Sequence, residues 1–136
     1  ELSDEDYKKR VESIKRFERQ LTDNGYLLLK FFFNIDKKEQ KKRLNKLKED
    51  KNTKWRVSEY DKWQNKHYEE CFDVYDQYLC DTDHSSAPWY IVDAKDKKWA
   101  QLQVLETIVQ GIDISHYQCH YYRMHFHLSL FLSFQR

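Results

Sequence analysis

The sequence predicts an α/β domain built around a parallel sheet, and three observations carry this prediction. Two short runs, residues 26–33 and 88–93, are continuously apolar or aromatic, which is typical of strands buried on both faces of a parallel sheet. Apolar residues at helical spacing surround both runs. The resulting order, helix–strand–helix–helix–strand–helix, has too few strands for an independent sheet that is covered on both faces. We therefore expect the second half of a doubly wound domain.

The first two helices are bounded by residue types that begin or end helices. Ser3, which three acidic residues follow, is expected to cap a helix whose apolar residues recur at steps of three and four. Gly25 supplies the left-handed conformation that ends this helix, just before the first apolar run. Asp36 with Glu39 then predicts the start of a second helix, which reaches about residue 48. Because this helix carries only two leucines on a narrow stripe, we expect most of its surface to face water or a ligand.

Two more helices lie on either side of the second apolar run. Ser58 and Asp61 predict the start of one long helix that continues to Leu79 with an aromatic face. Asp96 opens the final helix, and Gly111 is expected at its C-terminal end. The inward face of this final helix is predicted to consist of Trp99, Leu102, Leu105, Ile108 and Val109.

Positive charge is concentrated in one stretch, residues 37–56, which we call the basic segment. The whole chain has a net charge of only +1, yet the basic segment holds ten Lys or Arg against three Asp or Glu. A cluster of this kind concentrates the electrostatic field on anionic ligands, and its mixture of ammonium and guanidinium groups suits phosphate oxygens. The segment also follows a buried strand, at the end where ligands of open α/β sheets bind. These features favour a phosphate-holding surface over a merely solvated helix face.

The candidate phosphate-holding residues are Lys30, Lys42, Lys46, Lys54 and Arg56. Arg43 belongs to the same group of cations, and because it flanks the leucine stripe it can lean toward the domain. Lys30 lies inside the first apolar run, and besides a phosphate contact two other placements of its side chain are possible. Its stem is buried while the amine reaches out, or the amine pairs with a carboxylate.

Several features argue against a complete phosphotransferase within this chain. A nucleotide phosphate needs a glycine-rich loop of backbone amides, and the only glycines, Gly25 and Gly111, are both assigned to helix ends. No strand-end aspartate has a context suited to magnesium, and no Ser/His/Asp or Cys/His arrangement stands out. The three cysteines are odd in number and widely spaced, which fits a reduced, cytoplasmic setting, and Cys71 is expected to be a small buried hydrophobe. We see no signal segment and no membrane span.

The composition changes after Gly111. No lysine occurs beyond Lys98, while four histidines arrive among Tyr, Phe and Leu residues. We interpret residues 112–136 as a divergent tail, either non-native or disordered, although alternating apolar residues from 124 to 134 also fit a strand. No metal ligand is assigned, because two histidine pairs with spacings that zinc could use have no matching pair elsewhere: His116 with His120, and His125 with His127.

Four blocks of the sequence resemble the polyphosphate kinase 2 family. Residues 27–43 are similar to its strand and lid helix, and residues 54–61 to its lid segment with a Trp-basic pair. Residues 87–92 with the final helix resemble its last strand and helix, and residues 16–21 fit the helix before the strand. The blocks follow one another in the same order as in the family, over residues 3–111. The sequence around Trp55 is most similar to that of the two-domain polyphosphate:AMP phosphotransferases.

The resemblance implies a P-loop kinase fold similar to thymidylate kinase. Residues 1–111 would be the C-terminal part of such a domain, and residues 36–61 its helical lid. It also implies transfer of a phosphoryl group from polyphosphate to a nucleotide, AMP yielding ADP, with Mg²⁺ as cofactor. Arg43 matches a basic lid position expected to meet the transferring phosphates, which makes it the candidate catalytic residue. The family's Walker A and Walker B motifs do not occur here, so the Mg²⁺ ligands are not in this chain and the fragment alone is expected to be inactive.

The expected partners are inorganic polyphosphate and AMP or ADP, with a homo-oligomer or a tandem partner domain as further options. A catalytically inactive domain of a tandem protein, which binds polyanions or acts structurally, is the alternative. Nucleic acid is a rival ligand because Trp55 or Tyr60 could stack on a base. No RNA- or DNA-binding pattern accompanies the basic segment, however, so we expect no nucleic-acid partner. We also expect no membrane partner, because no apolar run is long enough to span a bilayer.

Overall fold

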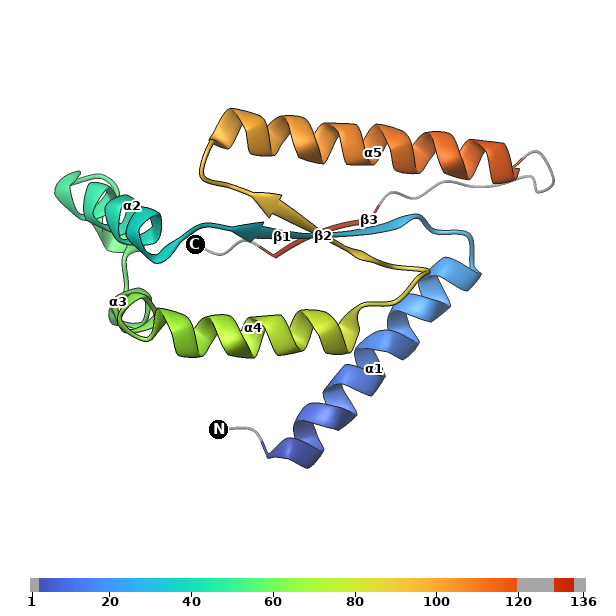
Figure 1. Ribbon diagram of the computed structural model, residues 1–136, viewed down its shortest axis with the longest axis horizontal. Coiled ribbons are helices and arrows are strands. Elements are labelled where there is room, and N and C mark those ends of the chain that lie inside the picture. The colour runs from blue at the N-terminus through green and yellow to red at the C-terminus, as the bar shows by residue number, and fades with distance from the viewer. Residues whose placement is uncertain (1–2, 120–128, 134–136) are drawn as a thin grey trace.

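A parallel sheet forms the centre of the molecule (Figure 1). The computed structural model describes residues 3–119 and 129–133 of the chain. Its strands are β1 (Leu28–Asn34), β2 (Trp89–Asp93) and β3 (Ser129–Ser133), in the spatial order β2-β1-β3. β1 therefore lies in the middle of the described sheet, and it pairs in parallel with both neighbours. The predicted α/β class with a parallel sheet is confirmed.

Helices cover both faces of this sheet. Figure 1 shows α5 on one face and α1 with α4 on the other, while α2 and α3 lie beyond the carboxyl end of β1. Among the described residues, no helix combines the length and the apolar character that crossing a bilayer requires. The helices are α1 (Asp4–Asp23), α2 (Lys37–Glu49), the short 3-10 helix η1 (Lys54–Arg56), α3 (Glu59–Lys66), α4 (Tyr68–Thr82) and α5 (Lys97–Cys119).

The predicted helix starts are confirmed by their caps. The Asp6 amide donates to the Ser3 hydroxyl at 3.1 Å, which begins α1. Gly25 follows α1 with a φ of 81°, the left-handed conformation that ends a helix at low cost when the residue is glycine. At α2 the Glu39 amide donates to the Asp36 carboxylate at 2.7 Å. The two ends of the first helix and the start of the second were therefore predictable from single residues.

The prediction of one long helix after Ser58 is wrong, because α3 and α4 are separate helices. α3 begins with the expected capping box between Ser58 and Asp61. His67 then leaves helical geometry, with φ −103° and ψ 35°. Its ring nitrogen Nδ1 donates to the Trp63 carbonyl at 2.9 Å, and its ring stacks on the Trp63 ring at 4.4 Å between centroids. These contacts compensate for the interrupted helix, and apolar spacing alone does not reveal the break.

The predicted inward face of α5 is also largely wrong. Of the predicted residues only Ile108 packs against the core, and the other four are between 43% and 60% exposed. Ala100 and Val104 pack toward the sheet together with Ile108, so the inward side of α5 is turned away from Trp99, Leu102, Leu105 and Val109. α5 also continues past Gly111, where a Cβ atom would lie 3.4 Å from side-chain carbons of Leu27 and Leu29. Because α5 is apolar on both sides, its periodicity does not show which side faces the sheet.

The second apolar run is less buried than predicted. Val92 is buried under α5, but Ile91, on the opposite face of β2, is 56% exposed, so the described helices cover this face of the strand only in part. The strand that the sequence allowed between residues 124 and 134 is present over β3. The rest of that stretch, and His120, His125 and His127, lie outside the described residues.

The two faces of β1 serve different purposes. Side chains alternate across a strand, and Leu29 and Phe31 join Val92, Ala94 and Ala100 in an apolar core under α5. The opposite face of β1 packs toward α1 and α4, where the Phe32 ring lies 6.0 Å from the Tyr75 ring. Lys30 shares this second face and is buried in it.

Lys30 is the centre of a buried polar network. Its Nζ donates to Glu18 Oε2 at 2.9 Å and to the Thr82 carbonyl at 2.8 Å, and it lies 5.0 Å from the centroid of the Trp89 ring. The His84 Nε2 atom lies 2.7 Å from the same Glu18 oxygen. A buried charge is tolerated only when it is paired and fully hydrogen-bonded. This network therefore ties β1 to α1 and to the connection between α4 and β2.

We predict that Lys30→Met destabilises the fold strongly. The substitution leaves the Glu18 carboxylate buried without its main cationic partner, which should lower the free energy of unfolding by about 3 kcal/mol. Urea denaturation followed by circular dichroism measures this loss. Lys42→Met, at an exposed position, is the matched control and should change stability by less than about 0.5 kcal/mol. A Lys30→Met protein as stable as the control would show that the buried pair contributes nothing to the fold.

Candidate functional site

The basic segment lies beyond the carboxyl end of the central strand. β1 ends at Asn34, and the Asp36 cap turns the chain directly into α2 (Figure 1). The amide of Ala94, which follows β2, donates to the Asn34 carbonyl at 2.9 Å. Two neighbouring strands therefore end side by side next to the basic segment. Open α/β sheets bind ligands at this edge.

Arg43 connects α2 to the chain that leaves β2. Its Nη2 donates to the Ala94 carbonyl at 2.7 Å and to the Lys95 carbonyl at 3.0 Å, while its Nε donates to Glu39 Oε1 at 2.9 Å. We call this set of contacts the Arg43 clasp. The side chain is 28% exposed, and its Nη1 has no hydrogen-bond partner within the described part of the chain. Arg43 thus leans toward the domain, as the leucine stripe predicts, and still has one group available for an anion.

Glu39 holds the guanidinium in place. The hydrogen bond from Arg43, followed by the charges of Lys42 and Arg43, lowers the pKa of the Glu39 carboxyl below its usual value against partial desolvation. Glu39 is therefore ionised at neutral pH and supplies a fixed counter-charge. The spacing of Glu39 and Arg43 is four residues, at which oppositely charged side chains on a helix meet.

A second contact joins the same two parts of the structure. Lys95 Nζ lies 3.3 Å from Asp36 Oδ2. The Glu39 amide, and after it Lys95, lower the pKa of the Asp36 carboxyl, which favours the charged form that caps α2. Together with the Arg43 clasp, this ion pair fixes the start of α2 against the connection between β2 and α5.

The other predicted cations are exposed and lie along α2 and η1. Lys42 and Lys46 are one helical turn apart on α2, and Lys54 and Arg56 lie on η1. Lys42 has only a weak contact, 3.5 Å from Glu39 Oε2, and its side chain is 78% exposed. These four side chains are therefore free to approach an anionic ligand without breaking internal structure.

Lys30 does not join this group. Its amine is bonded to Glu18 and to the Thr82 carbonyl on the sheet face that packs against α1 and α4. The side chain is only 3% exposed. Of the interpretations that the sequence left open, pairing with a carboxylate is the one observed. With its amine bonded to Glu18 and to the Thr82 carbonyl, Lys30 takes part in the internal structure and lies apart from the exposed cations of the basic segment.

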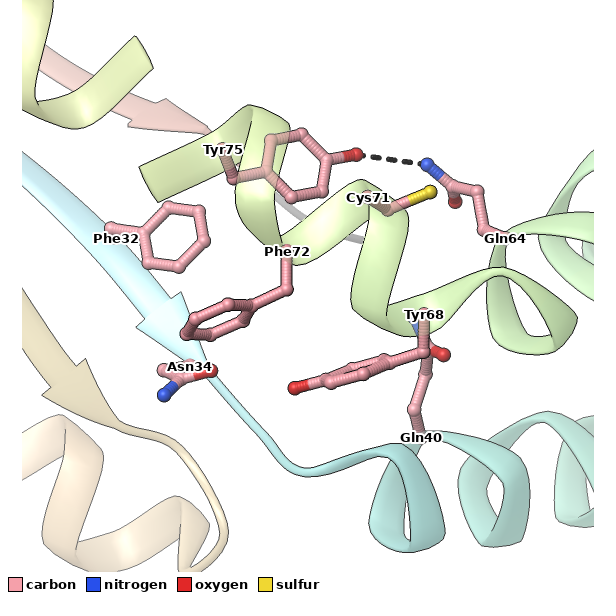
Figure 2. A pocket seen from close by; sticks show the side chains of 8 residues that line it. All are labelled: Phe32, Asn34, Gln40, Gln64, Tyr68, Cys71, Phe72 and Tyr75. Atoms are coloured by element: carbon pink, nitrogen blue, oxygen red, sulfur yellow. Dashed lines mark hydrogen bonds between the residues drawn. The ribbon is translucent and has the colours of Figure 1, made fainter. Parts of the chain in front are cut away.

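A pocket lies beside the carboxyl half of β1, where side chains from β1, α2, α3 and α4 converge (Figure 2). Gln64 donates to the Tyr75 hydroxyl at 2.9 Å, and the Tyr68 hydroxyl donates to the Ile35 carbonyl at 2.6 Å. The free space is about 20 Å³, which holds about one water molecule. The pocket lining consists of Phe32, Asn34, Gln40, Gln64, Tyr68, Cys71, Phe72 and Tyr75.

Cys71 is half-buried rather than fully buried, and it contributes to this pocket lining. Burial, with a smaller effect of the Glu70 charge, raises the pKa of the thiol. The thiol is therefore protonated at neutral pH, which makes it a poor nucleophile.

A second and larger depression lies within the α2–η1–α3 hairpin. It has a volume of about 420 Å³ and opens to solvent. Leu44 and Leu47 of α2 line it together with Trp55 and Arg56 of η1, and Ser58 and Asp61 complete the lining at the start of α3. We call it the hairpin groove.

The described residues contain no group of three or more His, Cys, Asp or Glu side chains that could hold a metal ion. The acidic residues near the sheet edge have other roles. Asp36 caps α2, the Asp93 carboxylate accepts from the Lys95 amide, and Asp96 accepts from the amides that begin α5. These three carboxylates are therefore already engaged in helix caps and turns of the described structure.

Sequence reasoning missed the partners of Arg43. The carbonyls of Ala94 and Lys95 are backbone groups more than fifty residues away, and no sequence pattern marks them. The sequence predicts Glu39 only as a capping residue, although its four-residue spacing to Arg43 also indicates an ion pair on the helix. Asn34, a polar residue at the end of an apolar run, was a similar signal for the pocket beside β1.

A parallel sheet with helices on both faces and a basic segment at its carboxyl edge belongs to the open α/β class, whose members bind ligands at this edge. Sequence comparison narrows this class. A model of the family polyphosphate kinase 2 matches residues 2–120. This chain therefore belongs to the polyphosphate kinase 2 family.

Individual relatives agree with this assignment. The chain is 34% identical over 102 residues to a polyphosphate:AMP phosphotransferase of Pseudomonas aeruginosa, covering 75% of this chain and 21% of that protein. It is 32% identical over 105 residues to an ADP-polyphosphate phosphotransferase of Rhodopseudomonas palustris, covering 77% of this chain and 36% of that protein. The crystal structure of polyphosphate kinase 2 from Arthrobacter aurescens TC1 is similar with a TM-score of 0.71 and 30% identity, covering 77% of this chain and 38% of that one. The chain thus spans about a fifth to two-fifths of these proteins.

We predict that Arg43→Ala weakens the attachment of α2 to the sheet edge. The substitution removes charge-assisted hydrogen bonds to two carbonyls and one carboxylate, which should lower the free energy of unfolding by about 1.5 kcal/mol. Thermal or urea denaturation measures the change. Lys41→Ala, on an exposed side of the same helix, is the control and should have little effect. Equal stabilities of the two variants would show that the clasp is not formed in solution.

Proposed function

We propose that the chain supplies the basic lid of a phosphotransferase that moves a phosphoryl group from polyphosphate to a nucleotide, AMP yielding ADP. The observation that carries the proposal is the position of the basic segment. Exposed cations line α2 and η1, and Arg43 is anchored at the carboxyl edge of the sheet while its Nη1 is available for an anion. Family membership and the names of the relatives support the same substrates.

The residues of this chain would act by positioning and charge neutralisation. Lys42, Lys46, Lys54 and Arg56 hold successive phosphates of the chain, since ammonium and guanidinium groups match phosphate oxygens. Arg43 faces the phosphates nearest to the sheet edge, where Glu39 and two carbonyls fix its orientation in advance. Preorganised charge of this kind stabilises an in-line phosphoryl transfer more than a mobile charge does.

The remaining parts of such an enzyme would come from outside these residues. The family resemblance implies a P-loop kinase fold in which residues 36–61 form the lid, a Walker A loop, a Walker B aspartate, Mg²⁺ and a cytoplasmic setting. Mg²⁺ would be bound by residues other than those described, and no step here depends on it. The alternative is a catalytically inactive domain that binds polyanions or acts structurally, and it uses the same basic surface.

Polyphosphate should bind the basic segment with a steep dependence on salt, because each phosphate contact releases a counterion. Lys42→Ala with Lys46→Ala should lower the slope of log affinity against log salt by about 2, roughly one for each lost contact. Titration of medium-chain polyphosphate into the chain at several salt concentrations gives the slope. Lys97→Ala with Lys98→Ala, at the start of α5, removes the same charge outside the segment and should leave the slope unchanged. Equal slopes for both pairs would mean that binding is not localised to α2.

Turnover separates the catalytic proposal from its alternative. In a phosphotransferase that combines this chain with the family's Walker A and Walker B motifs, Arg43→Ala should lower kcat by about 100-fold or more. A coupled assay of ADP formation from polyphosphate and AMP measures it. Lys41→Ala serves as the control for lost charge. An unchanged kcat in Arg43→Ala would remove Arg43 from the mechanism, whereas the absence of ADP formation by the unsubstituted protein would favour the inactive, polyanion-binding domain.

A further inference from the structure

Among the described residues, α5 exposes more large apolar side chains than any other element. The helix lies along one face of the sheet, with its outer side turned away from the strands (Figure 1). Its inner side packs Ala100, Val104 and Ile108 against the core. A contiguous exposed apolar surface of this kind marks an interaction site. The exposed side chains, which we call the outer stripe, are between 43% and 60% exposed and are Trp99, Leu102, Leu105 and Val109.

The spacing of the outer stripe fits a second helix. Leu102, Leu105 and Val109 follow one another at steps of three and four residues, so they lie in one line along α5. Trp99 lies beside this line, one turn before Leu102. A straight line of apolar side chains at this spacing is the seam along which two helices pack side by side. The stripe therefore suits an elongated helical partner better than a compact ligand.

Opposite charges lie at the two ends of the outer stripe. Lys98 comes one turn before Leu102, and Asp113 comes one turn after Val109, so both continue the line of the stripe. Both residues are exposed. Neither side chain has a partner among the residues that the structure describes. The outer stripe is therefore bounded by a free cation at one end and a free anion at the other.

This arrangement is complementary to itself. When two copies of α5 run antiparallel about a two-fold axis beside Leu105, Lys98 of each copy faces Asp113 of the other copy. Leu102 likewise faces Val109. An interface of this symmetry requires each residue to meet its complement at the position that the axis relates to it. A partner of unrelated sequence does not require opposite charges at equal distances from the centre of the stripe.

We propose that the outer stripe of α5 binds a second copy of this chain, as an antiparallel helix pair closed by two ion pairs between Lys98 and Asp113. The proposal uses no residue of the basic segment, which lies on α2 and η1. It is therefore independent of the proposed function, and a dimer of this kind keeps both basic segments outside the interface.

Sedimentation equilibrium of the 136-residue chain at several concentrations tests the interface. The chain should form a dimer with a measurable Kd. Leu105→Glu places a charge at the apolar centre of both halves of the interface and should raise this Kd about 100-fold or more. Val74→Glu is the matched control, because Val74 of α4 is 65% exposed on the opposite face of the sheet. This control should leave the Kd unchanged.

A charge swap tests the direction of the pairing with variants that alter only exposed positions. Lys98→Glu places like charges opposite each other at both ends of the interface and should raise the Kd about tenfold, and Asp113→Lys should do the same. The two substitutions together restore opposite charges and should return the Kd to within about threefold of the wild type. Lys97→Glu makes the same change of charge one residue away, on another side of the helix, and should have no effect.

Several results would overturn the proposal. A monomeric wild-type chain would mean that a different protein, or another part of a longer protein, covers the outer stripe. Equal weakening by Leu105→Glu and Val74→Glu would mean that association is a general effect of exposed apolar surface. No recovery in the combined charge variant would rule out the antiparallel pairing. Circular dichroism confirms that each variant is folded before its Kd is compared.

Discussion

The buried ion pair between Lys30 and Glu18 is the constraint around which this structure is organised. A lysine amine inside an apolar strand is tolerated only because a carboxylate of α1, a carbonyl at the end of α4 and the face of Trp89 all meet it there. The pair fixes the central strand to its two neighbouring helices on one face. The opposite face of β1 is then free to pack an apolar core under α5. The position and direction of β1 follow from these two faces together.

The functional features are at the other end of the same strand. Beyond Asn34 the chain turns into a helix with little apolar surface, and such a helix would be poorly held by packing alone. Arg43 and the ion pair between Asp36 and Lys95 provide the missing attachment. A cation that faces the sheet edge is thus both a structural tie and a charge placed for a ligand. The exposed lysines of α2 and the groove at Trp55 extend this arrangement outward from the sheet.

Local signals in the sequence were sufficient for the fold class and for the starts of α1, α2, α3 and α5, because caps and buried strands depend on residues that are close in the chain. Longer-range features were not accessible in the same way. α5 is apolar on both sides, so only its docking on the sheet shows that Ala100 and Val104 face inward while Leu105 does not. The carbonyl partners of Arg43 are backbone atoms with no sequence signature. Lys30 is a different case. A lysine inside an apolar strand can either contact a ligand or pair with a buried carboxylate, and only the folded structure distinguishes the two.

The central claim is that the basic segment is the phosphate-holding surface. The most direct test is backbone amide hydrogen exchange at low salt, measured with and without long-chain polyphosphate. Slower exchange is expected in peptides that cover residues 37–56 and the connection at Ala94 and Lys95. Peptides from α5, whose Lys97 and Lys98 are equally exposed, should exchange at the same rate in both conditions. Slowing spread evenly over all exposed lysines, or no slowing in residues 37–56, would contradict the account.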